Sequence, residues 1–178
     1  MILSVDPGLR HCGFALWWDD GPTPTLPATR LFYAGLATGA EGSDSPHRAV
    51  AQAVRAAWQS ANIVGYEGTV TTVVLERPQV YQKSPGDPND LIDLALVDGA
   101  LLGLFPAARV VLYKPAEWKK QLPKEITSAR ARAALEAAGS LSRVVLPTKS
   151  LQHNVWDAVG LGLHHLKNTP RVPKTATP

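Results

Sequence analysis

Cysteine is almost absent from this chain of 178 residues and occurs once, as Cys12. A disulfide within the chain is therefore excluded, and nothing in the sequence requires an oxidising compartment. Long apolar runs are also missing, since none approaches the ~20 residues that a membrane-spanning helix needs. The N-terminal residues read as a strand and lack the basic and then apolar pattern of a secretory signal. We therefore expect a soluble protein of the cytoplasm.

The remaining composition is ordinary for a globular protein, with 45% apolar and 19% charged residues. The length suits one domain with a substantial core. The pattern shows no internal repeat and no linker long enough to separate two domains. We expect one domain over residues 1–167 and a flexible Thr- and Pro-rich tail over residues 168–178.

Charge is unevenly distributed, although the net charge is only +3. Residues 1–108 hold 6 Lys and Arg against 11 Asp and Glu, whereas residues 109–149 hold 9 against 3. Residues 150–178 hold 3 against 1. A basic block on an otherwise acidic chain is typical of a surface that meets a phosphate backbone, although a solvated helical face has the same composition.

Periodicity predicts both strands and helices along the chain. Strands are expected at residues 2–5, 13–18, 30–35, 70–76 and 109–113. Helices are expected at residues 46–61, 88–105, 128–138 and 151–166. A Pro-Gly turn at residues 7–8 and a turn-rich loop at residues 19–26 connect the first three strands and predict an antiparallel meander. The order βββαβαβαα predicts an α/β layer fold with a mixed five-stranded sheet.

Three acidic residues stand where these elements end or turn: Asp6, Glu76 and Asp157. Burying an unpaired carboxylate costs several kcal/mol, so a positive group is expected close by. If the first and fourth strands are parallel neighbours, about 4.8 Å apart, Asp6 and Glu76 leave the sheet at the same edge. The helix that carries Asp157 would pack across that edge. Such oxygen ligands suit a hard divalent cation such as magnesium, which favours a metal-dependent nuclease.

A fourth ligand is expected one helical turn before Asp157. His153 precedes it by four residues and Asn154 by three, so both point along roughly the same helical face. His153 can ligate a metal or relay a proton near neutral pH. The alternative is a residue at the helix start that bonds to backbone. We assign His153 to the metal and to catalysis, ahead of Asn154.

In this order the motifs resemble the RuvC-type Holliday junction resolvases of the RNase H-like nuclease superfamily, in particular phage-type members. The resemblance rests on Asp-Pro-Gly at residues 6–8 with Gly13, on Glu76 after a hydrophobic strand, on residues 114–124, and on residues 153–162 around Asp157. It covers nearly the whole chain up to about Lys167. It implies a three-layer RNase H-like fold with helices on both faces of the sheet.

The resemblance also implies an activity, namely a homodimeric endodeoxyribonuclease that resolves four-way DNA junctions by paired symmetric nicks. It implies two Mg²⁺ ions per active site, replaceable by Mn²⁺, with Asp6, Glu76 and Asp157 as ligands. The expected ends are a 5′-phosphate and a 3′-hydroxyl. Many relatives carry Asp or His three residues before the last Asp, and this chain departs from them with Asn154. A phage enzyme of DNA recombination or repair, acting in the host cytoplasm, fits the likeness.

Several residues are expected to contact DNA. Relatives place an aromatic residue on a loop after the second carboxylate, so Tyr81 is predicted to stack on an unstacked base, or else to cap the core. Arg10 and His11 stand beside the first acidic loop and are expected to touch the scissile strand. Phosphate contacts are expected from Lys114, Lys119, Lys120, Lys124, Arg130 and Arg132.

Within that basic segment, Lys119 and Lys120 are the strongest candidates, because adjacent lysines near a proline are rarely buried. Trp118 is expected to anchor the segment in the core. The helix at residues 88–105 has more apolar residues than one half-buried face requires. Its apolar set includes Leu94, Leu101, Leu102, Leu104 and Phe105. The surplus is expected to contact a second copy of the chain, and Asp98 on the same helix has no evident partner.

Three alternatives stay open. An actin-like ATPase or sugar kinase shares the Asp-Pro-Gly loop, but it needs two domains and a Ser or Thr where this chain has Leu9. An RNase H-like nuclease for RNA–DNA hybrids, flaps or forks would use the same carboxylates. A junction-binding protein without cleavage is the third, and it would gain nothing from three carboxylates near phosphates.

Overall fold

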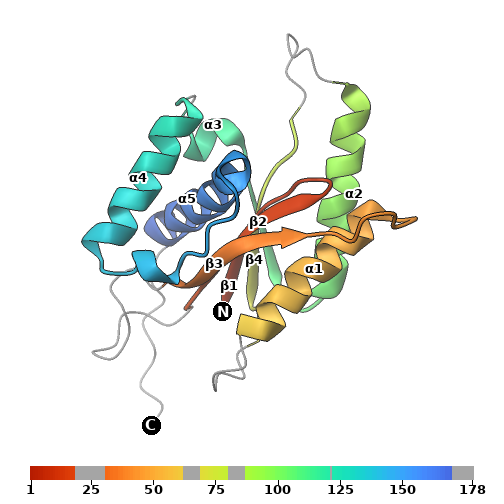
Figure 1. Cartoon of the computed structure of the whole chain (residues 1–178), viewed down its shortest axis with the longest axis horizontal. Coiled ribbons are helices and arrows are strands. Elements are labelled where there is room, and N and C mark those ends of the chain that lie inside the picture. Colours follow the sequence, from red (N-terminus) through yellow and green to blue (C-terminus); the bar gives the residue numbers. More distant parts are fainter. Residues whose placement is uncertain (19–30, 62–68, 80–86, 121, 170–178) are drawn as a thin grey trace.

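A mixed five-stranded sheet lies between two layers of helices in the computed structural model of the chain (Figure 1). The structure describes residues 1–18, 31–61, 69–79, 87–120 and 122–169. The strands are β1 (Ile2–Asp6), β2 (His11–Trp17), β3 (Leu31–Thr38), β4 (Thr72–Glu76) and β5 (Arg109–Tyr113). The helices are α1 (Pro46–Ala61), α2 (Pro88–Leu104), α3 (Pro115–Trp118), α4 (Lys124–Ala137) and α5 (Gln152–Asn168), with 3₁₀ turns η2 (Leu141–Arg143) and η3 (Lys149–Leu151).

The strand order is β3-β2-β1-β4-β5, which confirms the predicted mixed sheet. β1 pairs with β2 and β2 with β3 in antiparallel fashion, as the predicted meander requires. β4 lies parallel to β1 and to β5. The sheet centre is apolar because Val73, Val74 and Leu75 of β4 are fully buried, as expected for a strand covered on both faces. β1 and β4 are therefore the parallel neighbours that the acidic site requires.

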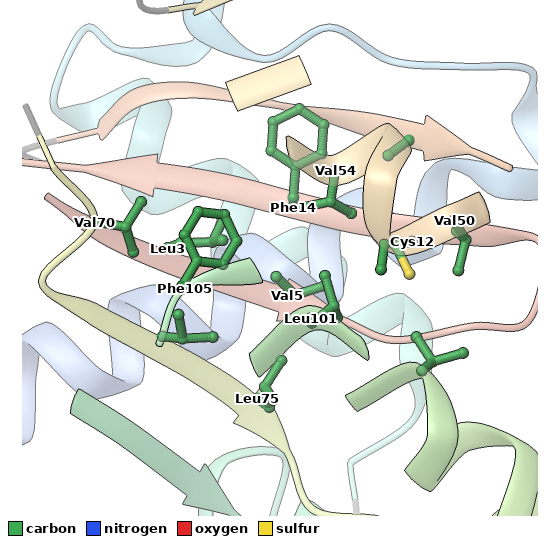
Figure 2. Packing of buried hydrophobic residues seen from close by; sticks show 14 of the residues in the cluster. Leu3, Val5, Cys12, Phe14, Val50, Val54, Val70, Leu75, Leu101 and Phe105 are labelled. Atoms are coloured by element: carbon green, nitrogen blue, oxygen red, sulfur yellow. The ribbon is translucent and has the colours of Figure 1, made fainter. Parts of the chain in front are cut away.

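Each face of the sheet has its own core because side chains alternate along a strand. Leu3 and Val5 of β1 point towards α1 and α2, where they pack with Leu75, Leu101 and Phe105 (Figure 2). The side chains that alternate with these along the strands point towards α4 and α5. That second core includes Ile2, Trp17, Val74, Leu135, Val155 and Val159. Helices thus cover both faces, as predicted.

Several predicted boundaries are wrong. β3 continues to Thr38 instead of ending at Gly35, because its pairing with β2 extends as far as His11. α4 begins at Lys124, four residues before the predicted start, directly after Pro123. The short helix α3 was not predicted, and α5 extends to Asn168, so the predicted tail begins inside a helix. Residues 170–178 lie outside the described residues.

The outer side of α2 is apolar. Asp87 caps the helix directly before Pro88 by accepting from the Asn89 N–H at 2.9 Å. Inward-facing residues are buried, yet Ile92 is 60% and Leu96 47% exposed. A hollow of about 500 Å³ lies between this side and α1. None of the described helices is both long and apolar enough to cross a membrane.

Candidate active site

The three predicted carboxylates come to one edge of the sheet. Val5 of β1 pairs with Leu75 of β4, so the next residues, Asp6 and Glu76, leave the carboxyl ends of neighbouring parallel strands. Asp157 of α5 reaches the same place and is 2% exposed. The charges of Asp157 and Glu76 both act on Asp6, which places the three groups in one electrostatic centre.

The position of Asp157 depends on how α5 is seated on the sheet. At Gly13 of β2, a β-carbon would collide with the backbone carbonyl of Asn154, so only glycine allows the helix to come this close. One turn further along, Ser4 of β1 donates to the Ala158 carbonyl at 2.8 Å. The same hydroxyl accepts from the Trp17 indole N–H at 2.8 Å. These contacts hold the turn of α5 that carries the carboxylate.

A lysine occupies the middle of this centre. The Nζ atom of Lys119 lies 3.0 Å from Glu76 Oε2 and 3.0 Å from Asp157 Oδ2. Its side chain is only 19% exposed. The sequence predicts exposure for both Lys119 and Lys120; the structure confirms it for Lys120, whereas Lys119 is partly buried. The physical reason is local backbone: α3 ends here, and Lys120 takes a positive φ of 51°, so the two side chains diverge.

Trp118 has a second role besides the predicted anchoring. Its ring packs on the α5 side of the sheet, against Gly160, as expected of an anchor. Its indole Nε1–H also donates to Glu76 Oε2 at 2.8 Å. The Lys119 Nζ atom lies 4.6 Å from the centroid of the Trp118 ring. One Glu76 oxygen is therefore held by two neighbouring residues of the same segment.

The electrostatics of the centre show a demand for positive charge. Burial raises the pKa of Asp6 well above its usual value, and the nearby charge of Asp157 raises it further. Burial alone would lower the pKa of Lys119, but the carboxylates of Asp157, Glu76 and Asp6 outweigh that effect and the pKa is raised. The ammonium is consequently kept charged beside the carboxylates.

The donor set fits a divalent cation. Asp157 Oδ1 is buried and has no hydrogen-bond partner among the described residues. Carboxylate oxygens are the ligands that Mg²⁺ takes, and the Lys119 ammonium stands where positive charge is wanted. The fit is one of donor chemistry, because no three His, Cys, Asp or Glu side chains of the described residues are grouped so as to hold one metal ion.

Comparison of the whole fold with solved structures identifies its type. Thermus thermophilus RuvC matches with a TM-score of 0.58 at 19% identity, covering 93% of this chain and 92% of the other. The same enzyme in complex with Holliday junction substrate gives 0.59 at 18% identity over the same shares. The yeast mitochondrial Holliday junction resolvase Ydc2 gives 0.50 at 8% identity, over 92% of this chain and 76% of the other. The fold is that of the RuvC-type resolvases. Compared by sequence, no family profile and no curated protein matches the chain.

On this RuvC-type fold, the predicted fourth ligands lie at the start of α5. His153 is partly buried and stands one turn before Asp157. Asn154 presents its backbone carbonyl to Gly13, which accounts for its backbone but leaves its side chain without an assigned role. Neither residue joins a metal-holding group in the described part of the chain, so both assignments stay predictions.

The predicted DNA contacts fall on two sides of the centre. Arg10 is exposed in the turn between β1 and β2. His11 begins β2 instead of lying in the loop, and its Nδ1 is 3.0 Å from Thr38 Oγ1. Along α3 and α4 the exposed basic residues are Lys114, Lys120, Lys124, Arg130 and Arg132. Tyr81 lies outside the described residues.

Sequence reasoning missed two features of this site, and one of them had a signal. Ser4 is a polar residue between the apolar Leu3 and Val5 of β1, which is unusual inside a central strand and indicates a specific partner. The inward position of Lys119 had no such signal, because it depends on the αL backbone of the next residue, which lysine rarely adopts.

Proposed function

We propose that this protein is a metal-dependent endonuclease that resolves four-way DNA junctions. The observation that carries the proposal is the meeting of Asp6, Glu76 and Asp157 at the carboxyl edge of a RuvC-type sheet, around a resident positive charge. The structural relative from Thermus thermophilus is seen with a Holliday junction, which supports this substrate class. The same carboxylates would serve a nuclease for another branched or hybrid substrate, which the experiment below separates.

In the proposed mechanism, Asp6, Glu76 and Asp157 would hold the divalent ions, with His153 as the fourth group. Two Mg²⁺ ions, or Mn²⁺ in their place, would acidify a water molecule and stabilise charge on the leaving oxygen. The residues of the chain orient this chemistry. Trp118 fixes the rotamer of Glu76 through its indole N–H, and the seating of α5 fixes Asp157. His153 accepts or returns a proton near the site. The products carry a 5′-phosphate and a 3′-hydroxyl.

DNA binding is proposed for the basic surface of α3 and α4 and for the turn at Arg10. The exposed Lys120, Lys124 and Arg130 contact phosphates without reading sequence. On the other side of the centre, a hollow of about 480 Å³ is lined by Leu9, Arg10 and residues 39–46. A strand that passes from one side to the other lies across the three carboxylates. Salt is expected to weaken this binding strongly.

Paired symmetric nicks need two active sites, so we propose a homodimer. The apolar outer side of α2 supports this arrangement, because Ile92 and Leu96 are exposed and Gly99 and Gly103 leave open space beside them. Leu96→Glu is expected to convert the dimer into a monomer in a light-scattering measurement. An unchanged mass would remove α2 as the contact.

The proposed function is tested with Asp157→Asn and labelled four-way junctions in Mg²⁺ or Mn²⁺. We expect cleavage to fall by at least ~100-fold while junction binding is retained, since even outer-shell groups of a metal site are worth 10–100-fold. Asp90→Asn, at an exposed position in the first turn of α2, is the matched control and should cleave normally. Direct ligation of the nicked products checks the proposed ends.

Linear duplex, a flap and an RNA–DNA hybrid are the substrate controls. Paired nicks in the junction alone support a resolvase. Cleavage of the hybrid or flap instead keeps the site and overturns the substrate. Tight junction binding without cleavage in either metal, by the wild-type protein, identifies a non-cleaving junction binder. Normal cleavage by Asp157→Asn refutes the site.

A further inference from the structure

We infer that Lys119 is a built-in competitor of the metal, in that its ammonium and a divalent cation exclude each other from Glu76 and Asp157. In the metal-free protein the ammonium holds these carboxylates together, and metal binding releases it. The inference rests on the proposed function, because it assumes that the centre takes a divalent ion. It adds a residue whose position reports whether the metal is bound.

The geometry places the ammonium on the oxygens that a metal would use. Lys119 Nζ lies 3.0 Å from Glu76 Oε2 and 3.0 Å from Asp157 Oδ2, and the pair is shielded, with side chains 19%, 20% and 3% exposed for Lys119, Glu76 and Asp157 respectively. A surface ion pair of ordinary exposure would be weak. This one is mostly removed from water and bridges two acids, so it is an organised part of the centre.

Simultaneous occupation is unfavourable for two reasons. A Mg²⁺ ion sits ~2.0–2.1 Å from each oxygen ligand, so an ion bound to Glu76 and Asp157 would lie within a few ångströms of Nζ. Two cations at that distance repel strongly when water is largely excluded. In addition, Glu76 Oε2 and Asp157 Oδ2 already contact the ammonium at 3.0 Å, so a metal ion bound to the same two oxygens has to replace it. The metal therefore needs the place of the ammonium.

The surrounding segment is built so that the lysine can leave. Lys119 is the last residue associated with α3, and the backbone turns at Lys120 with a φ of 51°. Trp118, the residue before Lys119, donates its own hydrogen bond to Glu76 at 2.8 Å. The anchor and the cation are thus adjacent but separate, so the side chain of Lys119 can swing outwards while Trp118 keeps Glu76 in position.

The first test uses the unaltered full chain. The amines are labelled briefly with an acylating reagent after chelator treatment, with and without MnCl₂ or MgCl₂, and each lysine is followed by peptide mass spectrometry. We expect Lys119 to be protected without metal and to react several-fold faster with metal. The exposed Lys120 and Lys124 should react equally in both states. Lys119 that stays protected in saturating metal overturns the inference.

The second test measures metal binding by calorimetry with Lys119→Met. Removing the competitor should lower the Kd for Mn²⁺ by roughly tenfold, because the metal no longer has to displace an ammonium from two shielded carboxylates. Lys124→Met is the matched control. Lys124 acts on Asp6 through space, without an ion pair, so this variant shows how the Kd changes when a nearby positive charge is lost but no ion pair is broken. Metal should also raise the melting temperature more in Lys119→Met than in the wild type.

The outcomes separate this inference from the proposed function. Equal Kd values for Lys119→Met and the wild type, with an unchanged labelling rate, overturn the competition while a nuclease is still possible. Tighter metal binding without any junction cleavage supports the competition and removes the nuclease. Absence of metal binding in every variant overturns both. The labelling test needs no variant, so it decides even if Lys119→Met does not fold.

Discussion

Asp98 should make the stability of this protein fall as pH rises towards neutrality. The side chain lies in α2, the residue is 8% exposed, and Oδ1 has no partner among the described residues. Burial raises the pKa of this carboxyl from 3.8 to about 7. The folded protein therefore keeps the proton in a range where the unfolded chain has lost it.

The sign and size follow from that difference. Below pH ~4 both states hold the proton, so Asp98 has no pH effect on the free energy of unfolding. Between pH ~4 and ~7 only the folded state holds it, and stability falls with each step in pH. A pKa difference of about 3 at ~1.36 kcal/mol each gives a loss of at most ~4 kcal/mol, complete above pH ~7. Above that pH the contribution is constant.

Asp98→Asn removes the titration and keeps the shape of the side chain. Urea unfolding at pH 4 and pH 8 should show the variant close to the wild type at pH 4 and more stable by a few kcal/mol at pH 8. Asp90→Asn, at an exposed position of the same helix, should follow the wild type at both pH values. The same gap between Asp98→Asn and the wild type at both pH values would refute the reasoning, whatever the absolute stabilities.

Two further changes test how α5 is seated. Gly13→Ala should destabilise by ~3 kcal/mol because its β-carbon meets the Asn154 carbonyl, whereas Gly103→Ala, with open space around it, should stabilise by up to ~1 kcal/mol in urea unfolding. Stabilisation by Gly13→Ala would refute the close approach. Ser4→Ala should cost ~1–3 kcal/mol by leaving the Trp17 N–H unpaired, and should slow junction cleavage more than it weakens junction binding. Cleavage at the wild-type rate would show that this bond does not position Asp157.

The sheet and its acidic edge were predictable because they depend on local patterns. A continuous β-branched run marks β4 as a central strand, and the turn-forming residues on both sides of β2 in the sequence indicate the antiparallel meander. Once β4 is parallel to β1, Asp6 and Glu76 must share an edge. The predicted end of β3, placed at a glycine, was wrong because its pairing with β2 continues further. The predicted start of α4, placed at the alanine-rich stretch, was wrong because the helix begins directly after Pro123.

The inward position of Lys119 could not be predicted by the same means. Adjacent lysines are usually solvated, and the sequence around them gives no reason to separate the two. Their directions diverge because Lys120 adopts a left-handed conformation and because Glu76 and Asp157, distant in sequence, offer two oxygens at the end of α3. Such a pairing depends on tertiary structure and overrides the local tendency towards exposure.

The burial of these carboxylates therefore predicts that a positively charged group lies beside them, but it does not predict which group. Three carboxylates in one shielded place require positive charge, and sequence reasoning identified that charge with a metal. In the structure the charge nearest to Glu76 and Asp157 is an ammonium, yet one buried oxygen of Asp157 has no hydrogen-bond partner among the described residues, so the ammonium leaves part of the demand for positive charge unmet. A divalent ion would meet it better than a monovalent one. The free energy gained by binding the metal has to exceed the free energy lost when the lysine contacts break. The metal affinity of this centre therefore depends on the difference between the binding free energies of the two cations.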